Sequence, residues 1–498
     1  MDYPVIDSCR VLEEPVRVIP ANSSVACDAY HEGKLMTTEL WQKSAHDLAA
    51  AIRGKDVSAT EVLEAHLGRI AATNPTINAI VTLSEDIALA QAKAVDEAVA
   101  AGERLGPIAG VPVGIKDTTD TAGIRTTYGS PLFADNVPQR DDIMVARLKQ
   151  AGGIIVGKTN NPEFATGGNT YNDVFGATLN PWDTNLSAGG STGGGAAGLA
   201  SGMFPIASGS DLAGSLRIPA AFCGVMGLRP TVGLVPSGPS NIPFDSLGVS
   251  GPMARTAEDL AIFLEIISQP HPSDPFCQQS RFKASERSQD GHLRIAYVRD
   301  VCGIDVETGV AKACREAVQT LHTAGHTVEE LALDFRDGRE SFLTLRAQWM
   351  VTKNLGLLDR IDELGENLAG NIRAGLEQKP TDIARAEAIR NRLWKQLVEV
   401  FETYDVIATP TLPIPPFPVT LNYPESINGQ KMANYIEWVG PSLVFSLFGV
   451  PALSVPAGLV DGLPAGLQLV GPRFSEDKLI FLADQVAQRR PIPLADLG

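Results

Sequence analysis

The chain has 498 residues and a formal net charge of −17 at pH 7, because its 58 Asp and Glu residues outnumber its 41 Lys and Arg residues. An acidic surface disfavours nucleic acids and anionic membranes as partners, since both are bound through clustered basic side chains. The hydrophobic fraction of 44% and the charged fraction of 20% are ordinary for a globular protein with a sizeable core.

The six cysteines are scattered, and the sequence contains no CxxC pair and no Cys/His cluster. A disulfide framework is typical of short secreted chains, so this pattern predicts reduced thiols in a cytoplasmic protein. It also predicts that the protein holds no metal ion. No apolar run reaches the roughly 18 residues that a membrane-spanning helix needs, and we expect no membrane association.

Residues 1–36 have neither the apolar core of a secretory signal nor a clear helical pattern. We expect them to be a flexible N-terminal extension of a single domain over 37–498. A helical pattern begins at Thr38, and Ser58 with Glu61 matches the capping box that starts many helices.

An apolar run over 108–117 predicts a strand that ends near Lys116. Residues 141–152 predict an amphipathic helix, 154–158 a short buried strand, and 193–202 a tightly packed helix of small residues. After residue 255 the alternation continues, with helices over 256–268, 306–324, most of 340–403 and 475–488, and strands at HLRIAYV, HTVEELAL, DVIATPT, PALSVPAG and AGLQLVG. This alternation favours one large α/β core with a more variable helical region over about 272–404.

The segment 187–227 is unusually rich in glycine, with eleven in 41 residues where an average chain has roughly three. Glycine weakens helices and strands, so this density predicts backbone geometry that side chains would forbid. Two serines preceded by glycine stand within it, Ser191 in GGSTGGG and Ser215 in SDLAGSLR. We expect these serines and Lys116 to form a hydrolase active site.

Two short motifs in the chain match known sites but lack the required context. Gly152–Thr159 fits the P-loop pattern, yet its middle is an apolar strand and no apolar helix follows. Gly189–Gly193 fits the G-x-S-x-G nucleophile elbow, but a polar loop rather than a strand precedes Ser191. A Ser-His-Asp esterase stays an alternative, because four histidines lie downstream.

All seven histidines lie outside residues 67–270, so the nearest candidate base for a nucleophilic Ser215 is Lys116. Burial disfavours the charged form of a lysine, and a lowered pKa is what a lysine needs to act as a base. Taken singly, each feature has an ordinary interpretation: a lysine at a strand end is usually solvated, and Gly-Ser runs are usually turns.

Taken together, several strings resemble the amidase signature family over about residues 38–490. They are GVPVGIKD (110–117), GKTNNPEFA (157–165), FGATLNPWD (175–183), GGSTGGGAA (189–197), SGSDLAGSLRIPAAFCGVMGLRPT (208–231), DVIATPT (405–411), GVPALSVPAG (449–458) and GLPAGLQLVGP (462–472). The resemblance implies an α/β fold with a large mixed central β-sheet, helices on both faces and a peripheral helical insertion.

The resemblance also implies roles for particular residues. Ser215 is then the acylated nucleophile, Ser191 a bridging serine in a cis peptide, and Lys116 the terminal base. Backbone amides of the segment Leu212, Ala213, Gly214 and Ser215 would bind the oxyanion of the tetrahedral intermediate. Asp211 and Arg217 are expected to form a structural pair beside the nucleophile.

Three positions depart from the family pattern: Thr192 replaces a serine, Gly195 stands where serine is frequent, and Ala213 replaces a glycine of the oxyanion loop. We expect the methyl group of Ala213 to crowd the floor of the pocket and change substrate preference. The loop SDLAGS also differs from the Thr-Asp-Thr-Gly-Gly-Ser of the family member that makes glutaminyl-tRNA, which disfavours that function.

The expected activity is hydrolysis of a carboxylic amide, anilide or carbamate of small size, without a cofactor. Ester or urethane hydrolysis on the same three residues is an alternative, whereas a non-catalytic scaffold is disfavoured because all three are present. Family members are commonly homodimers. Phe164, Trp349, Ile436, Trp438 and Phe445 suggest an apolar acyl group, although each is also an ordinary core residue.

Overall fold

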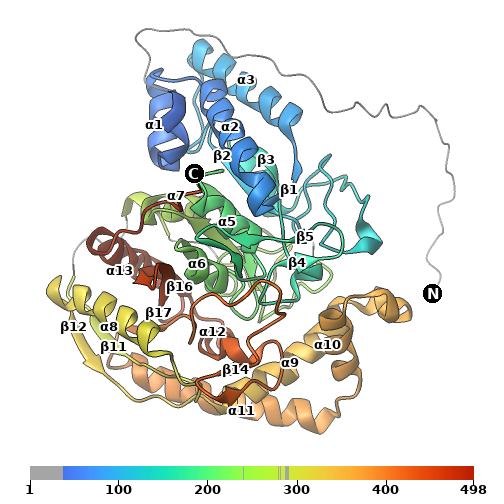
Figure 1. Cartoon of the computed structure of the whole chain (residues 1–498), viewed down its shortest axis with the longest axis vertical. Helices are drawn as coiled ribbons and strands as arrows, with labels where there is room; N and C mark the ends of the chain where they lie inside the picture. Colours follow the sequence, from blue (N-terminus) through green and yellow to red (C-terminus); the bar gives the residue numbers. More distant parts are fainter. Residues whose placement is uncertain (1–36, 239, 279, 281, 287–290, 498) are drawn as a thin grey trace. The chain divides into compact units, whose positions relative to one another are not determined.

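The computed structural model describes residues 37–498 apart from 239, 279, 281, 287–290 and 498, so the expected N-terminal extension lies outside the described residues. A central sheet of 11 strands runs through this part of the chain (Figure 1). Its strands are β1 (Ile80–Leu83), β2 (Pro112–Lys116), β3 (Ile154–Thr159), β8 (Ile206–Asp211), β9 (Met226–Arg229), β10 (Val249–Ala254), β11 (Arg294–Tyr297), β12 (Thr327–Glu330), β13 (Val406–Pro410), β16 (Ala452–Val460) and β17 (Leu463–Val470).

The strands lie in the order β1-β3-β2-β8-β10-β9-β16-β17-β13-β11-β12. Pairing is parallel between β2 and its neighbours β3 and β8, and between β11 and its neighbours β12 and β13. The other pairs are antiparallel. The sheet is therefore mixed, as expected, and the carboxyl ends of β2 and β8 meet at one edge.

Two groups of helices pack on this sheet. Helix α5 (Gly193–Ala200) contacts α6 (Arg217–Cys223), and both contact the central strands. Helix α13 (Glu476–Arg489) contacts α7 (Ala257–Ile267) and α8 (Thr308–Thr323), and these three also contact strands of the same sheet. The expected α/β fold with helices on both faces is confirmed.

The N-terminal part adds α1 (Ala45–Gly54), α2 (Ala59–Ile77), α3 (Glu85–Ala101) and α4 (Ile143–Gln150). The expected capping box is present at the start of α2. The Glu61 backbone N–H donates to Ser58 Oγ at 3.0 Å, and the Ser58 N–H donates to Glu61 Oε2 at 2.9 Å.

The region expected to be mostly helical contains α9 (Asp337–Lys353), α10 (Glu366–Leu376) and α11 (Pro380–Phe401), and α9 packs against the other two. The same region also contributes β11 and β12 to the central sheet. The last short helix of the chain before β16 is α12 (Gly440–Ser446).

The P-loop match at Gly152–Thr159 forms β3, between β1 and β2, and a 3₁₀ turn at Glu163–Ala165 follows rather than an α-helix. The strand that precedes Ser191, β7 (Asp183–Ser187), pairs with β6 (Leu179–Asn180) and ends four residues earlier. Both motif matches therefore lack the structure that their usual chemistry requires.

Small residues let α5 approach the sheet closely. A Cβ atom on Gly198 would lie 2.3 Å from Cζ of Phe204, and one on Gly114 of β2 would lie 2.7 Å from the same atom. Phe204 is fully buried, so neither contact has room to relax outward. This close packing fixes the start of α5 beside the end of β2.

Gly198→Ala is expected to lower the free energy of unfolding by about 1–3 kcal/mol, because the added methyl group overpacks the contact with Phe204. Gly370→Ala in α10 is the matched control, since a Cβ there meets no atom within 4 Å. The control should gain up to about 1 kcal/mol from helix propensity. Urea unfolding of both variants measures the difference, and equal effects would contradict the packing argument.

Candidate active site

Four elements place the candidate residues at one edge of the sheet. Lys116 is the last residue of β2, and the parallel register aligns Gly114 with Ala207 of β8. Ser191 lies two residues before α5, and Ser215 lies two residues before α6. The Gly190–Ser191 peptide bond is cis, as the resemblance implies.

Lys116 is fully buried and surrounded by hydroxyl groups. Its Nζ lies 2.7 Å from Ser191 Oγ. The same atom lies 3.0 Å from Thr192 Oγ1 and 3.1 Å from Ser210 Oγ. The backbone N–H of Lys116 donates to Ser208 Oγ at 3.1 Å, so alternate residues of β8 hold both ends of this lysine.

Burial lowers the pKa of Lys116 to about 7. The negative charge of Asp211 opposes this shift, and the positive charge of Lys353 adds to it. Desolvation has the largest effect because an ammonium group loses its hydration in a buried site. A substantial fraction of Lys116 is therefore neutral near pH 7, with a lone pair available to accept a proton.

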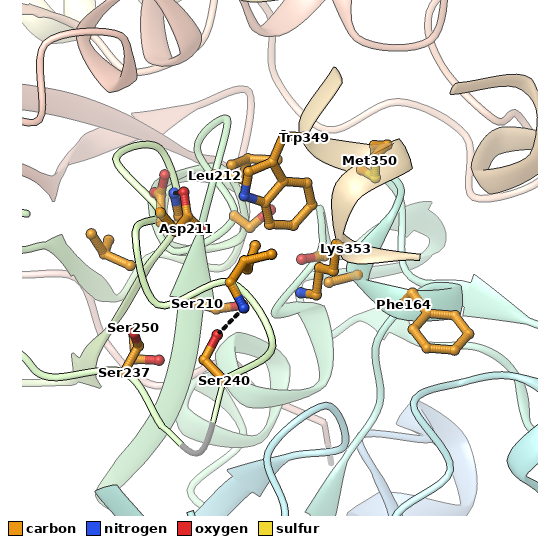
Figure 2. A pocket seen from close by; sticks show the side chains of 17 residues that line it. Phe164, Ser210, Asp211, Leu212, Ser237, Ser240, Ser250, Trp349, Met350 and Lys353 are labelled. Atoms are coloured by element: carbon orange, nitrogen blue, oxygen red, sulfur yellow. Dashed lines mark hydrogen bonds between the residues drawn. The ribbon is translucent and has the colours of Figure 1, made fainter. Parts of the chain in front are cut away.

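Ser191 and Ser215 line one cavity of about 160 Å³ (Figure 2). Ser215 is half-buried, so its hydroxyl is accessible from the cavity. Most of the other lining residues come from the end of β8, the segment 237–250 and α9. Figure 2 shows Trp349, Met350 and Lys353 on the side opposite Ser237, Ser240 and Ser250.

The loop before Ser215 presents backbone amides to the site. The N–H of Gly214 donates to Asp211 Oδ1 at 2.9 Å, so this amide is already engaged. In the part of the chain that the structure describes, the N–H groups of Leu212, Ala213 and Ser215 make no hydrogen bond. These three amides are the ones that an oxyanion could use.

Ala213 does not lie where the sequence suggested. It is buried within an apolar cluster that includes Ile218 and Leu247, and it is not part of the cavity wall. Its φ angle is not positive, so the position does not require glycine. The expectation that its methyl group crowds the pocket floor is wrong, because that methyl group points into the core.

Asp211 is the centre of a buried ion network. Arg217 donates to both carboxylate oxygens at 2.9 Å, from Nε to Oδ2 and from Nη2 to Oδ1. Arg229 Nη1 lies 3.3 Å from Oδ1 and donates to the Asp211 backbone carbonyl at 2.7 Å. Burial opposes ionisation of Asp211, but the two arginines outweigh it and lower the pKa of Asp211 to about 2. The expected pairing of Asp211 with Arg217 is confirmed.

Arg217 also connects the nucleophile loop to the C-terminal part of the chain. Its Nη1 donates to the carbonyl oxygen of Ser442 at 2.8 Å and to Gln468 Oε1 at 2.5 Å. Its Nη2 donates to Ser446 Oγ at 2.8 Å. Helix α12 and strand β17 therefore hold the segment that carries Ser215.

The structure brings Lys116, Ser191 and Ser215 to the same site, as the sequence predicted. It adds Thr192 and Ser210, which the sequence analysis did not identify as partners of Lys116. The alternation of hydroxyl side chains in SGSD, immediately before the nucleophile loop, was the available signal, because residues two apart in a strand face the same side.

No histidine of the described residues lines the cavity or hydrogen-bonds to either serine. His66 is buried elsewhere, with Nδ1 3.2 Å from the Met203 carbonyl oxygen. A Ser-His-Asp arrangement at Ser191 or Ser215 is therefore absent from this part of the chain. Among these residues there is also no group of three or more potential metal ligands, and no helix is long and apolar enough to cross a membrane.

The aromatic residues that suggested an apolar acyl group separate into two sets. Phe164 and Trp349 line the cavity. Ile436, Trp438 and Phe445 belong to a buried core cluster and do not reach the cavity. The site is thus more polar than the sequence suggested.

Comparison with known proteins gives consistent matches. A family model described as Amidase matches residues 61–480. The chain is 35% identical to an acylamidase of Rhodococcus erythropolis, over 88% of this chain and 93% of the relative. It is also 35% identical to the corresponding component of a glutamyl-tRNA(Gln) amidotransferase from Roseiflexus sp. (strain RS-1), over 90% of this chain and 96% of the relative.

Among solved structures, the chain resembles a bacterial aryl acylamidase of the amidase signature enzymes family. The TM-score is 0.84 at 26% sequence identity, and the match covers 90% of this chain and 96% of the other.

Lys116→Met is expected to make stability less dependent on pH. The pKa of Lys116 falls from 10.5 to about 7 on folding, so between these values the unfolded state binds more protons and wild-type stability rises with pH. The slope contributed by this group is up to about 1.4 kcal/mol per pH unit.

Urea unfolding between pH 7 and pH 10 measures this effect. The variant should gain most relative to wild type at pH 7, and Lys395→Met, at an exposed position of α11, should gain nothing that depends on pH in this way. A pH-independent difference between Lys116→Met and wild type would show that Lys116 keeps an ordinary pKa in the folded protein.

Proposed function

The chain belongs to the amidase signature family, and on that premise we propose that it is an amidohydrolase that cleaves a carboxylic amide C–N bond through an acyl-enzyme on Ser215. One observation carries the proposal: Lys116 is fully buried, has hydroxyl groups as its side-chain partners, and lies 2.7 Å from a serine that shares a cavity with Ser215. A serine hydroxyl is a weak nucleophile until a base takes its proton, and a neutral lysine can serve as that base.

In the acylation step, Ser215 Oγ attacks the carbonyl carbon of the substrate. The Ser215 proton passes to Ser191 Oγ while the Ser191 proton passes to Lys116 Nζ, so the relay ends with a protonated lysine. When the tetrahedral intermediate collapses, the C–N bond breaks and the proton returns through Ser191 to the leaving nitrogen. The amine departs and Ser215 carries the acyl group as an ester.

Deacylation repeats the same transfers with water. Water attacks the ester carbonyl and gives its proton through Ser191 to Lys116, and the proton then returns to Ser215 Oγ as the acid leaves. The negative oxygen that forms in each step can accept from the N–H groups of Leu212, Ala213 and Ser215. Loss of one such donor typically costs about 3 kcal/mol in the barrier.

The same relay can hydrolyse anilides, carbamates and esters, because each has a carbonyl carbon that Ser215 can attack. A panel of aliphatic amides, anilides, carbamates and esters with a common acyl group separates these candidates by kcat/KM. We propose amides and anilides as the preferred class, in accord with the acylamidase relative. A strong preference for esters over the matched amides would contradict this assignment.

The amidotransferase relatives favour a second candidate, in which the site releases ammonia from glutamine for transfer to another substrate. The nucleophile loop argues against it, because SDLAGS departs from the usual sequence of those proteins. Glutamine belongs in the same panel. Hydrolysis of glutamine above all other amides would favour this second function.

The proposed substrate is a small molecule, and we propose no cofactor. The cytoplasmic location and the homodimer expected from the sequence stay predictions of this proposal. Size-exclusion chromatography with light scattering tests the second of them.

Ser215→Ala and Lys116→Ala are each expected to lower turnover by about a thousandfold or more, because the nucleophile and the terminal base act as one unit. Ser426→Ala, an exposed serine of the two-residue strand β14 (Ser426–Ile427), is the control and should keep wild-type activity. Single substitutions of all seven histidines should retain most activity. Turnover of an amide by the purified variants checks each point, and a histidine variant as inactive as Ser215→Ala would contradict the lysine mechanism.

A further inference from the structure

Lys353 is the one cationic side chain among the described residues that line the cavity. It lies in the last turn of α9, one turn after Trp349. Its ammonium sits 4.7 Å from the centre of the Trp349 ring, which holds the charge at the cavity wall (Figure 2). The side chain is exposed to the cavity rather than enclosed by protein.

This ammonium makes no ion pair and no hydrogen bond within the described part of the chain. The two carboxylates of the cavity wall have other partners. Asp211 is paired with two arginines, and Asp245 Oδ1 accepts from the N–H groups of Leu247 and Gly248 at 2.8 and 3.0 Å. The indole N–H of Trp349 also has no acceptor. Two donors of one helix turn are thus without a partner beside the nucleophile.

The rest of the wall suits a polar ligand group. Six serines line the cavity: Ser191, Ser210, Ser215, Ser237, Ser240 and Ser250. Hydroxyl groups can donate to an anion and lose little by facing water when the site is empty. A substrate that is apolar throughout would leave the Lys353 ammonium desolvated and unpaired, which costs free energy.

We propose that the substrate carries a carboxylate in addition to the scissile amide, and that Lys353 binds this carboxylate in the cavity. The inference rests on the proposed function and deepens it by naming the class of substrate. Lys353 is then a specificity residue, since it selects among amides that the same serine can attack.

Two pairs of substrates test the proposal, each differing only by a carboxylate in place of a methyl group. On the acyl side they are the mono-4-nitroanilide of glutaric acid and the 4-nitroanilide of pentanoic acid. On the amine side they are N-butanoyl-4-aminobenzoate and N-butanoyl-4-methylaniline. The measured quantity is the ratio of kcat/KM for the anionic member to that for the neutral member.

The wild-type enzyme should favour the anionic member of at least one pair. Lys353→Met should lower that ratio by roughly 5- to 50-fold, between the effects typical of exposed and buried ion pairs, and mainly through KM. Lys353→Arg keeps the charge and should restore most of the preference. Lys395→Met, the exposed control in α11, should leave the ratio at the wild-type value.

Asp245→Asn provides a test of opposite sign. Asparagine keeps an oxygen that can accept from Leu247 and Gly248, but it removes a negative charge close enough to oppose the lowering of the Lys353 pKa. The ratio should therefore rise by about two- to fivefold.

A ratio that Lys353→Met leaves unchanged would overturn this inference while leaving the amidohydrolase intact, provided that hydrolysis still depends on Ser215. Equal losses for both members of a pair would also overturn it, because they would show a structural role for Lys353. Absence of Ser215-dependent hydrolysis of all four substrates would instead count against the proposed function itself, and against this inference with it.

Discussion

The desolvation of Lys116 is the constraint on which the candidate site depends. An ammonium group buried among hydroxyls is disfavoured, so the neutral amine becomes available near pH 7. This balance would fail beside an uncompensated carboxylate, because a negative charge would restore the proton. Asp211 lies close enough to do so, yet Arg217 and Arg229 neutralise it. The ion network and the buried lysine are therefore two parts of one electrostatic arrangement.

The same network accounts for the placement of the nucleophile. Asp211 accepts from the Gly214 and Leu216 amides, which fixes the path of the loop on either side of Ser215. Arg217 extends this support to α12 and to Gln468 of β17, more than two hundred residues away in sequence. The C-terminal strings that resemble the family thus have a structural reason: they hold the loop that the N-terminal half presents to the cavity.

Much of this could be predicted from the sequence where the signal is local. The capping box at Ser58 appears as a helix start, and the apolar run before Lys116 appears as a buried strand. The interpretation of Gly152–Thr159 as a strand rather than a P-loop was also correct. The three candidate catalytic residues could be assigned because glycine spacing and the resemblance pointed to the same positions. The short helix α6 was not predicted, since Pro219 stands inside it and its seven residues show no clear periodicity.

What could not be predicted depends on contacts between distant segments. Nothing in the local sequence shows that Ala213 points into the core, that the Gly214 amide is engaged by Asp211, or that Lys353 reaches the cavity from α9. The central claim is that a neutral Lys116 activates Ser215. It is tested most directly by the rate at which a fluorophosphonate acylates Ser215 between pH 5 and pH 9. The account predicts a rise with a midpoint near the Lys116 pKa of about 7, which disappears in Lys116→Met. A rate that does not depend on pH, or that has the same profile in both proteins, would contradict it.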